Sequence, residues 1–322
     1  MNHVALGASR LEVSRLCLGT MNFGRHVSTA DAHAILDHAH ESGINYIDTA
    51  NRYGTPDRPH ASEEIIGDWI AQGGGRRERT VLATKVFEET DPWPNNGGLS
   101  ALNIRRACDA SLRRLKTDYI DIYQMHHIDR GAGWDEVWEA YDVLRAQGKV
   151  LYAGSSNFAG WHLAMAQTSA RARGSLGLVS EQSVYSLAQR TIELEVLPAA
   201  RALGIGVVAW SPLAGGLLAG PPDPAGRRHS DPGFAERAAR HSAQLERTAA
   251  IADAAGMPVA VLALSWLLAQ PGLAAAIVGP RTIGQLDSML IAAEVQLDDA
   301  VLDELDETWP GPGGAAPEAY AW

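Results

Sequence analysis

Four side chains of this sequence could together deliver a proton to a carbonyl oxygen: Asp48, Tyr53, Lys85 and His126. A tyrosine with its ordinary pKa of about 10 does not readily release a proton at neutral pH, but a nearby ammonium stabilises the phenolate. Lys85 could supply that ammonium, and Asp48 could be its counterion. A neutral His126 could donate a hydrogen bond to a substrate oxygen. The alternative is a structural salt bridge between Asp48 and Lys85, with Tyr53 packed above it.

Other kinds of chemistry find no support in the motifs. Ser155 and Ser156 lack the GxSxG elbow of serine hydrolases, so we expect no serine nucleophile. The two cysteines, Cys17 and Cys108, form no CxxC pair and lie within apolar patterns. We therefore expect no metal site and a reducing compartment.

The elements that would position these residues alternate regularly along the chain. Helical patterns separate eight short apolar runs, and a polar residue follows nearly every run. Eight such units over about 300 residues favour a (β/α)8 (TIM) barrel of the α/β class, whose active site lies at the carboxyl ends of the strands. The expected strands are 15–18, 45–47, 81–84, 119–125, 150–154, 178–180, 206–209 and 274–278.

The segments between and around the strands complete the expected fold. Residues 4–13 alternate apolar and polar side chains around a turn, which predicts an N-terminal β-hairpin covering the bottom of the barrel. Residues 220–237 are rich in Pro, Gly and charge, so we expect one of the long loops of the active-site face, a candidate lid over bound cofactor. Residues 309–322 form a Pro/Gly tail. The expected helices are 31–41, 62–71, 104–115, 134–146, 160–173, 193–202 and 259–269.

Composition excludes several classes of partner. The 322 residues are 46% apolar, which suffices for one large barrel domain spanning residues 1–322. The formal net charge of −11 disfavours nucleic acid and anionic membranes. The longest apolar run, 259–269, is too short to span a bilayer. We expect a soluble cytoplasmic protein; its oligomeric state cannot be inferred.

Several motifs give the sequence a strong resemblance to the aldo-keto reductase family over nearly the whole chain. They include CLGTMNFG (17–24), GINYIDTANRYG (43–54), LATKV (82–86), GKVLYAGSSNF (148–158) and WSPLAGGLL (210–218). The nearest branches are bacterial relatives similar to potassium-channel β subunits and to enzymes of deoxysugar pathways. Matched position by position, the family's catalytic tetrad falls on the four residues named first, with Tyr53 as proton donor.

The resemblance also implies a nicotinamide cofactor bound without a Rossmann fingerprint, and the sequence contains no GxGxxG. Arg281 matches the arginine that meets the 2′-phosphate, which favours NADPH. The chain departs from the family at Ser288 and Met289, where many relatives carry Glu-Asn, so the usual adenine contact is lost or replaced. The implied cofactor-binding residues are Gly19, Thr20, Met21, Asp48, Ser156, Asn157, Gln182, Trp210, Ser211, Pro212, Leu213, Gly215, Gly279, Arg281, Gln285 and Met289.

The expected reaction is the reduction of an aldehyde or ketone to the alcohol. Aromatic and polar side chains of the active-site loops are candidate substrate contacts: Phe23, Phe87, Trp93, His127 and Trp134. The segments NNGGLS (95–100) and HHIDR (126–130) are similar to those of deoxysugar enzymes, which points to a keto-sugar or a nucleotide-linked sugar. The alternatives are a cofactor-binding sensor of the same fold with slow turnover, and a non-redox barrel enzyme.

Overall fold

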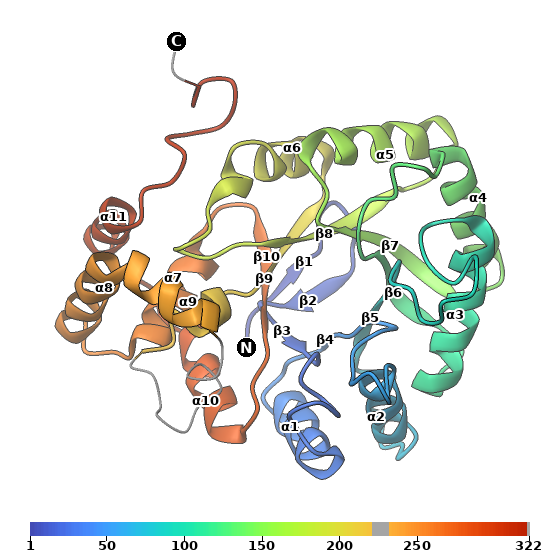
Figure 1. The fold of residues 1–322 in the computed structure, drawn as a ribbon, viewed down its shortest axis with the longest axis horizontal. Helices are drawn as coiled ribbons and strands as arrows, with labels where there is room; N and C mark the ends of the chain where they lie inside the picture. The colour runs from blue at the N-terminus through green and yellow to red at the C-terminus, as the bar shows by residue number, and fades with distance from the viewer. Residues whose placement is uncertain (221–231, 321–322) are drawn as a thin grey trace.

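Parallel strands close into an eight-membered barrel at the centre of the computed structural model, which describes residues 1–220 and 232–320 (Figure 1). Neighbouring strands pair in the order β10-β3-β4-β5-β6-β7-β8-β9, so the chain runs once around the barrel before β10 meets β3. The barrel strands are β3 (Leu16–Gly19), β4 (Tyr46–Asp48), β5 (Val81–Val86), β6 (Ile120–Met125), β7 (Val150–Ser156), β8 (Leu178–Val184), β9 (Gly206–Trp210) and β10 (Leu273–Val278).

Helices surround the barrel, and α8 and α11 pack together on one side of it (Figure 1). No single helix in the described segments is long and apolar enough to cross a bilayer; only α8 and α9 taken together reach that length and composition, with a 92° bend between them. The helices are α1 (Thr29–Glu41), α2 (Ala61–Ile70), α3 (Ala101–Leu115), α4 (Trp134–Ala146), α5 (Gly160–Ala172), α6 (Val196–Leu203), α7 (Pro232–Arg240), α8 (Ser242–Ala254), α9 (Val259–Ala269), α10 (Ile283–Ala292) and α11 (Asp299–Thr308), with short 3-10 turns η1 (Thr191–Glu193) and η2 (Ala214–Gly216).

The predicted barrel and hairpin are confirmed. The hairpin pairs β1 (His3–Ala5) with β2 (Glu12–Ser14) in antiparallel register. Its buried Leu6 packs with Tyr46 and Val208 of the barrel interior. The Ala8 N–H donates to the Gly204 carbonyl just before β9, which places the hairpin at the amino ends of the strands.

One expectation about the loops is wrong in part. Residues 232–237, expected within a long loop, belong to helix α7. The Pro-Gly pair at its start reads as a loop signal, but proline is well tolerated in the first turn of a helix. Residues 221–231, the rest of the candidate lid, lie outside the described residues. Helices α8 and α11 were not anticipated from sequence.

Strand alternation explains how polar groups come to lie at one end of the barrel interior. Successive side chains of a strand point to opposite faces, so residues two apart share a face. Tyr46 and Ile122 belong to the apolar interior cluster, which places Asp48 and Gln124 on the same inner face nearer the carboxyl ends. Ala83 places Lys85 there in the same way. An apolar floor therefore lies beneath a polar rim.

The outer helices are fixed by close backbone contacts as well as by apolar burial. Gly67 of α2 faces the end of α3, and a Cβ atom built there would lie 2.0 Å from the Arg114 carbonyl oxygen. A side chain at this position would push α2 away from α3. Because α2 follows the loop that carries Tyr53, its placement contributes to the placement of that loop.

Replacing Gly67 by alanine should therefore destabilise the fold by about 1–3 kcal/mol, the usual cost of overpacking. The matched control is Gly284→Ala in α10, where a Cβ would meet nothing within 4 Å. Alanine's higher helix propensity should leave the control unchanged or up to about 1 kcal/mol more stable. Urea unfolding measures both. Equal stabilities of the two variants would contradict the close α2–α3 contact.

Candidate active site

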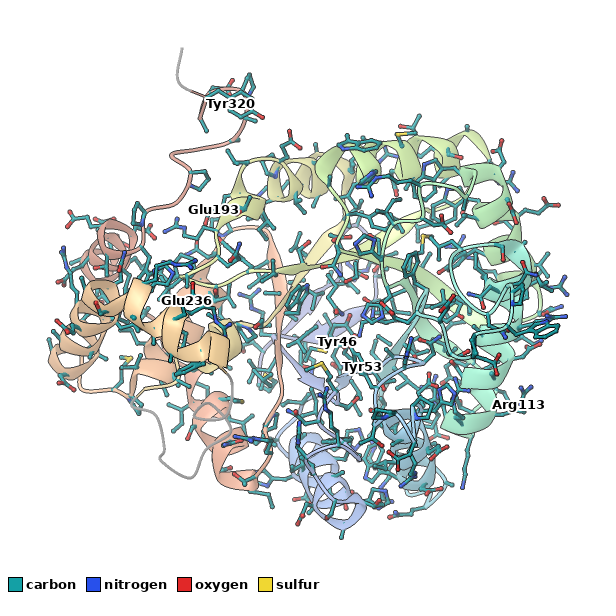
Figure 2. The ribbon with its side chains drawn as sticks, in the orientation of Figure 1. Tyr46, Tyr53, Arg113, Glu193, Glu236 and Tyr320 are labelled. Atoms are coloured by element: carbon teal, nitrogen blue, oxygen red, sulfur yellow. The ribbon has the colours of Figure 1, made fainter. Side chains whose placement is uncertain are left out.

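A buried ammonium lies at the carboxyl end of the barrel. The Lys85 Nζ donates to Asp48 Oδ2 at 2.6 Å, to the Thr49 carbonyl at 2.9 Å and to Tyr53 Oη at 3.0 Å. Lys85 is completely buried and Asp48 is 2% exposed. Three acceptors use the three donors of an ammonium, so the charge is fully hydrogen-bonded without water. Figure 2 shows Tyr53 near the centre of the barrel.

Backbone hydrogen bonds hold the segment between Asp48 and Tyr53 across the end of β5. The Thr49 N–H donates to the Ala83 carbonyl at 2.9 Å, and the Asn51 N–H donates to the Lys85 carbonyl at 3.3 Å. The Tyr53 carbonyl in turn accepts from the N–H of Ser62 in the first turn of α2. The phenol is thus placed by the strand that carries Lys85 and by the helix that follows.

The second oxygen of Asp48 receives two amide donors. Gln124 Nε2 lies 3.0 Å and Gln182 Nε2 lies 2.8 Å from Asp48 Oδ1. The sequence resemblance places Gln182 at the cofactor; in this structure its amide NH₂ contacts the carboxylate. Gln124 was missed from sequence, although a polar residue inside the apolar run of β6 is a usable signal. The Asp48 side chain therefore accepts hydrogen bonds from one ammonium and two amides.

The protonation states suit a proton donor. Burial lowers the pKa of Lys85, but the Asp48 carboxylate and the Tyr53 hydroxyl more than offset this, so its pKa lies above the ordinary value. Burial raises the pKa of Tyr53, and the Lys85 ammonium opposes that shift. At neutral pH the phenol keeps its proton beside a permanent positive charge. That charge favours the phenolate that forms when the proton leaves.

His126 faces the edge of the Tyr53 ring. The two ring centroids are 5.9 Å apart in an edge-to-face arrangement. The backbone N–H of His126 donates to the Val86 carbonyl. Burial, and then the charge of Lys85, lowers the pKa of His126 to about 3. The imidazole is neutral at physiological pH and can donate one hydrogen bond to an uncharged oxygen. The four residues expected at the site are thus brought together.

A second group of expected residues lies at the ends of β7, β8 and β9. Trp210 Nε1 donates to Asn157 Oδ1 at 3.1 Å, and the Asn157 amide donates to Ser156 Oγ at 3.0 Å and to the His126 carbonyl at 3.2 Å. Ser156 Oγ donates to the Gln182 carbonyl at 2.9 Å. Asn157 adopts a left-handed backbone with φ of 61°. The indole is therefore fixed at the rim beside the residues that surround Lys85.

The remaining expected cofactor residues follow β3, β9 and β10. Thr20 is buried with its hydroxyl on the Asp48 carbonyl, whereas the Met21 side chain is exposed. Arg281 precedes α10; its backbone N–H donates to Gln285 Oε1, and its guanidinium makes no hydrogen bond or ion pair with the residues described. Gly19 and Gly279 lie at the carboxyl ends of β3 and β10. The segment after β9 that includes η2 contains Ser211, Pro212, Leu213 and Gly215, and Met289 lies on α10.

The expected substrate contacts differ in their exposure to solvent. Phe23 is completely buried and belongs to the hydrophobic core. Its backbone N–H donates to the Thr20 carbonyl at 2.9 Å. Phe87 and His127 pair at 5.5 Å between ring centroids, while Trp93 is 74% exposed.

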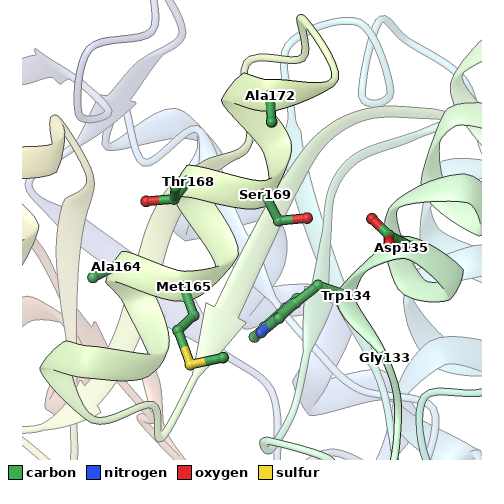
Figure 3. Close-up of a pocket in the computed structure, with 8 residues that line it drawn as sticks. All are labelled: Gly133, Trp134, Asp135, Ala164, Met165, Thr168, Ser169 and Ala172. Carbon is green, nitrogen blue, oxygen red and sulfur yellow. The ribbon is translucent and has the colours of Figure 1, made fainter.

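A depression of about 610 Å³ lies away from this site, between the start of α4 and the helix α5 (Figure 3). Trp134, expected in the pocket wall, and Met165 line it. Its lining includes none of Asp48, Tyr53, Lys85 and His126, so we do not assign the reaction to it.

Glu181 is a buried carboxylate that the sequence did not reveal. It is completely buried in β8; its Oε2 accepts from Ser155 Oγ, and its Oε1 accepts from the Phe158 N–H at 3.0 Å and from Ser183 Oγ at 2.8 Å. Burial raises its pKa to about 7, which these hydrogen bonds oppose. The carboxylate thereby holds the segment that carries Asn157.

Comparison with known proteins agrees with the geometry. The model of the aldo/keto reductase family matches residues 15–310, so the chain belongs to that family. The chain is 52% identical, over the full length of both, to the uncharacterized oxidoreductase YrpG of Bacillus subtilis. It is 31% identical to the norsolorinic acid reductase stcV of Emericella nidulans, over 93% of this chain and 79% of the relative. It is also 31% identical to a probable voltage-gated potassium channel subunit beta of Arabidopsis thaliana, over 95% of this chain and 96% of the relative.

Glu181 should make stability fall as the pH rises. Its folded pKa of about 7 exceeds the ordinary 4.5, so between these values the folded protein holds a proton that the unfolded chain has released. Relative to Glu181→Gln, the wild type should lose up to about 3 kcal/mol of unfolding free energy from pH 4.5 to 7, and no more above pH 7. Denaturant unfolding across this range measures it.

The matched control is Glu139→Gln, because Glu139 is an exposed carboxylate on α4. If the Glu181→Gln and Glu139→Gln variants differed from the wild type in the same way across this pH range, burial would not raise the folded pKa of Glu181.

Proposed function

We propose that this protein is an NADPH-dependent oxidoreductase that reduces an aldehyde or ketone to the alcohol, with Tyr53 as the proton donor. Family membership supports carbonyl reduction. The observation that carries the proposal is the 3.0 Å hydrogen bond from Lys85 Nζ to Tyr53 Oη. Asp48, 2.6 Å from the same Nζ, raises the pKa of Lys85 and keeps it protonated.

The proton step follows from these contacts. The reduced nicotinamide, when bound, supplies the hydride for the carbonyl carbon. Tyr53 Oη gives its proton to the carbonyl oxygen, which becomes the alcohol hydroxyl. Lys85 stabilises the phenolate left behind, and Asp48 keeps Lys85 protonated. Such general acid catalysis typically contributes about 10² to 10⁴ in rate.

His126 would orient the substrate rather than exchange protons with it. Its neutral ring lies beside Tyr53 and can donate a hydrogen bond to the same carbonyl oxygen. A histidine of pKa about 3 keeps the same charge over the physiological pH range. Its contribution should therefore be independent of pH above about 5.

The cofactor residues fit a nicotinamide dinucleotide phosphate. Trp210, fixed by its bond to Asn157, offers an aromatic face for the nicotinamide ring, and Ser156 and Gln182 lie beside it. At the other end, Arg281 precedes the amino end of α10, and its guanidinium makes no ion pair with the part of the chain that is described. The first N–H groups of α10 favour an anion. This pairing of guanidinium and helix start supports NADPH over NADH.

For the substrate, we propose a small carbonyl compound, with a keto-sugar or a nucleotide-linked sugar as the class to test. The support is the sequence resemblance of segments 95–100 and 126–130 to deoxysugar enzymes. In the structure both segments adjoin the site: the Gly98 N–H donates to the Phe87 carbonyl, and His127 pairs with the Phe87 ring. The loops that would select a substrate thus meet at Phe87.

Replacing Tyr53 by phenylalanine should lower the reduction rate about 10² to 10⁴-fold and leave NADPH affinity unchanged, because the ring remains and only the proton is removed. Single-turnover NADPH oxidation with an aromatic aldehyde measures the rate, and fluorescence titration measures the affinity. Tyr320→Phe, at an exposed position, is the control. A variant that kept more than half of the wild-type rate would rule out Tyr53 as the donor.

Replacing Arg281 by alanine should weaken NADPH binding about ten- to a hundredfold, the range for a lost charge-assisted contact, and leave NADH nearly unchanged. Fluorescence titration with both cofactors tests this. Arg105→Ala, on the exposed side of α3, should change neither affinity. Equal weakening for NADPH and NADH would mean that Arg281 has a structural role only.

A further inference from the structure

A second cavity, of about 170 Å³ and lined mainly by polar side chains, lies behind the segment that carries Tyr53. It is bounded by the loop after β4, the loop after β5 and one face of α3. None of Asp48, Tyr53, Lys85 or His126 lines it, so it is separate from the reaction site. Its polar lining residues are Asn51, Thr90, Asn96, Asn103, Arg106 and Arg114.

Arg106 and Arg114 give the cavity lining two guanidinium groups in a protein of net charge −11. The lining residue Asn96 donates through Nδ2 to Asp91 Oδ1 at 3.4 Å, so one carboxylate lies beside the cavity wall. Helix α3 has one acidic residue, Asp109, which already pairs with Lys149 at 2.8 Å. Glu63 neutralises Arg114 through a bond of 2.7 Å to Nε. Arg106 makes no ion pair or hydrogen bond with the residues described, so its positive charge is left at the cavity. No acidic side chain lines the cavity.

Asn51 supplies a buried polar group without a partner. The residue is 1% exposed, and its Oδ1 makes no hydrogen bond with residues 1–220 or 232–320. A buried amide without partners is costly. The oxygen and nitrogen of an amide are assigned from the surrounding hydrogen bonds, and rotation of this amide by 180° exchanges donor and acceptor. In the rotated orientation, the Asn51 NH₂ would donate to a ligand in the cavity that accepts hydrogen bonds.

We propose that this cavity binds a free inorganic oxyanion of the size of phosphate or sulfate. Guanidinium groups match the oxygens of tetrahedral anions, and Arg106 and Arg114 are the two that reach the cavity. Asn51, with its side-chain amide rotated, gives a hydrogen-bond donor from the opposite wall. A volume of 170 Å³ accommodates one such anion with ordered water, since a water molecule occupies about 30 Å³ of liquid.

Binding here would act on the loop that carries Tyr53. The Asn51 N–H donates to the Lys85 carbonyl, and its carbonyl accepts from His60. A ligand held by the Asn51 side chain would therefore tie this segment to α3. The site and its test do not depend on the proposed reaction.

The test is isothermal titration with inorganic phosphate at constant ionic strength, using full-length protein that carries Arg281→Gln to remove the other proposed phosphate site. Saturable binding should be at least about tenfold weaker with Arg106→Gln than with the control Arg113→Gln. Arg113 is exposed, outside the cavity lining, and projects from the outer side of α3 (Figure 2). Absence of saturable binding, or equal affinity of the two variants, would overturn the proposal.

A second pair of variants separates charge from shape. Ala110 lines the cavity on α3, so Ala110→Asp places a carboxylate against the guanidinium groups, while Ala110→Asn has nearly the same shape without charge. Phosphate binding should be lost in the first and retained within a few-fold in the second. Thermal unfolding confirms that both are folded. Equal binding by the two folded variants would also overturn the proposal.

Discussion

The buried ion pair between Lys85 and Asp48 sets the main constraint on this structure. Moving two charges out of water costs several kcal/mol per ion, and their attraction offsets this only if the remaining donors and acceptors are also satisfied. The structure meets that condition with the Thr49 carbonyl and the Tyr53 hydroxyl on one side, and with Gln124 and Gln182 on the other. The ion pair and its hydrogen-bond partners come from β4 and the loop after it, β5, β6 and β8, so the pair requires a closed barrel.

The same hydrogen bonds join the two halves of the site. From Tyr53 the contacts run through Lys85 and Asp48 to Gln182, whose carbonyl accepts from both the N–H of Asn157 and the hydroxyl of Ser156. Asn157 then holds Trp210. The proposed proton donor and the proposed nicotinamide platform are thus parts of one network. We therefore expect that a substitution in one half of this aldo/keto reductase site also alters the other half.

How much could be predicted from sequence depends on whether a feature is local. The eight apolar runs, each followed by polar residues, predict the barrel and place Asp48 and Lys85 at one end of it. Gln124 was missed because its inward direction follows from strand register, and Glu181 because its hydroxyl and amide partners come from β7 and the turn beyond it. The burial of Phe23 was not predicted, because the direction of a loop side chain depends on turns that short motifs do not encode. Helix α7 was missed because its proline and glycine mark both loops and helix starts.

The central claim is that Lys85 acts on the reaction through Tyr53. The direct measurement is a double-mutant cycle on the single-turnover reduction rate, with Lys85→Met, Tyr53→Phe and both changes together, each saturated with NADPH. Residues that act as a unit give strongly non-additive losses. If the claim holds, Lys85→Met should slow the wild-type enzyme greatly and the Tyr53→Phe variant hardly at all. If the two losses instead multiply, Lys85 serves the reaction independently of the phenol, and the claim is wrong.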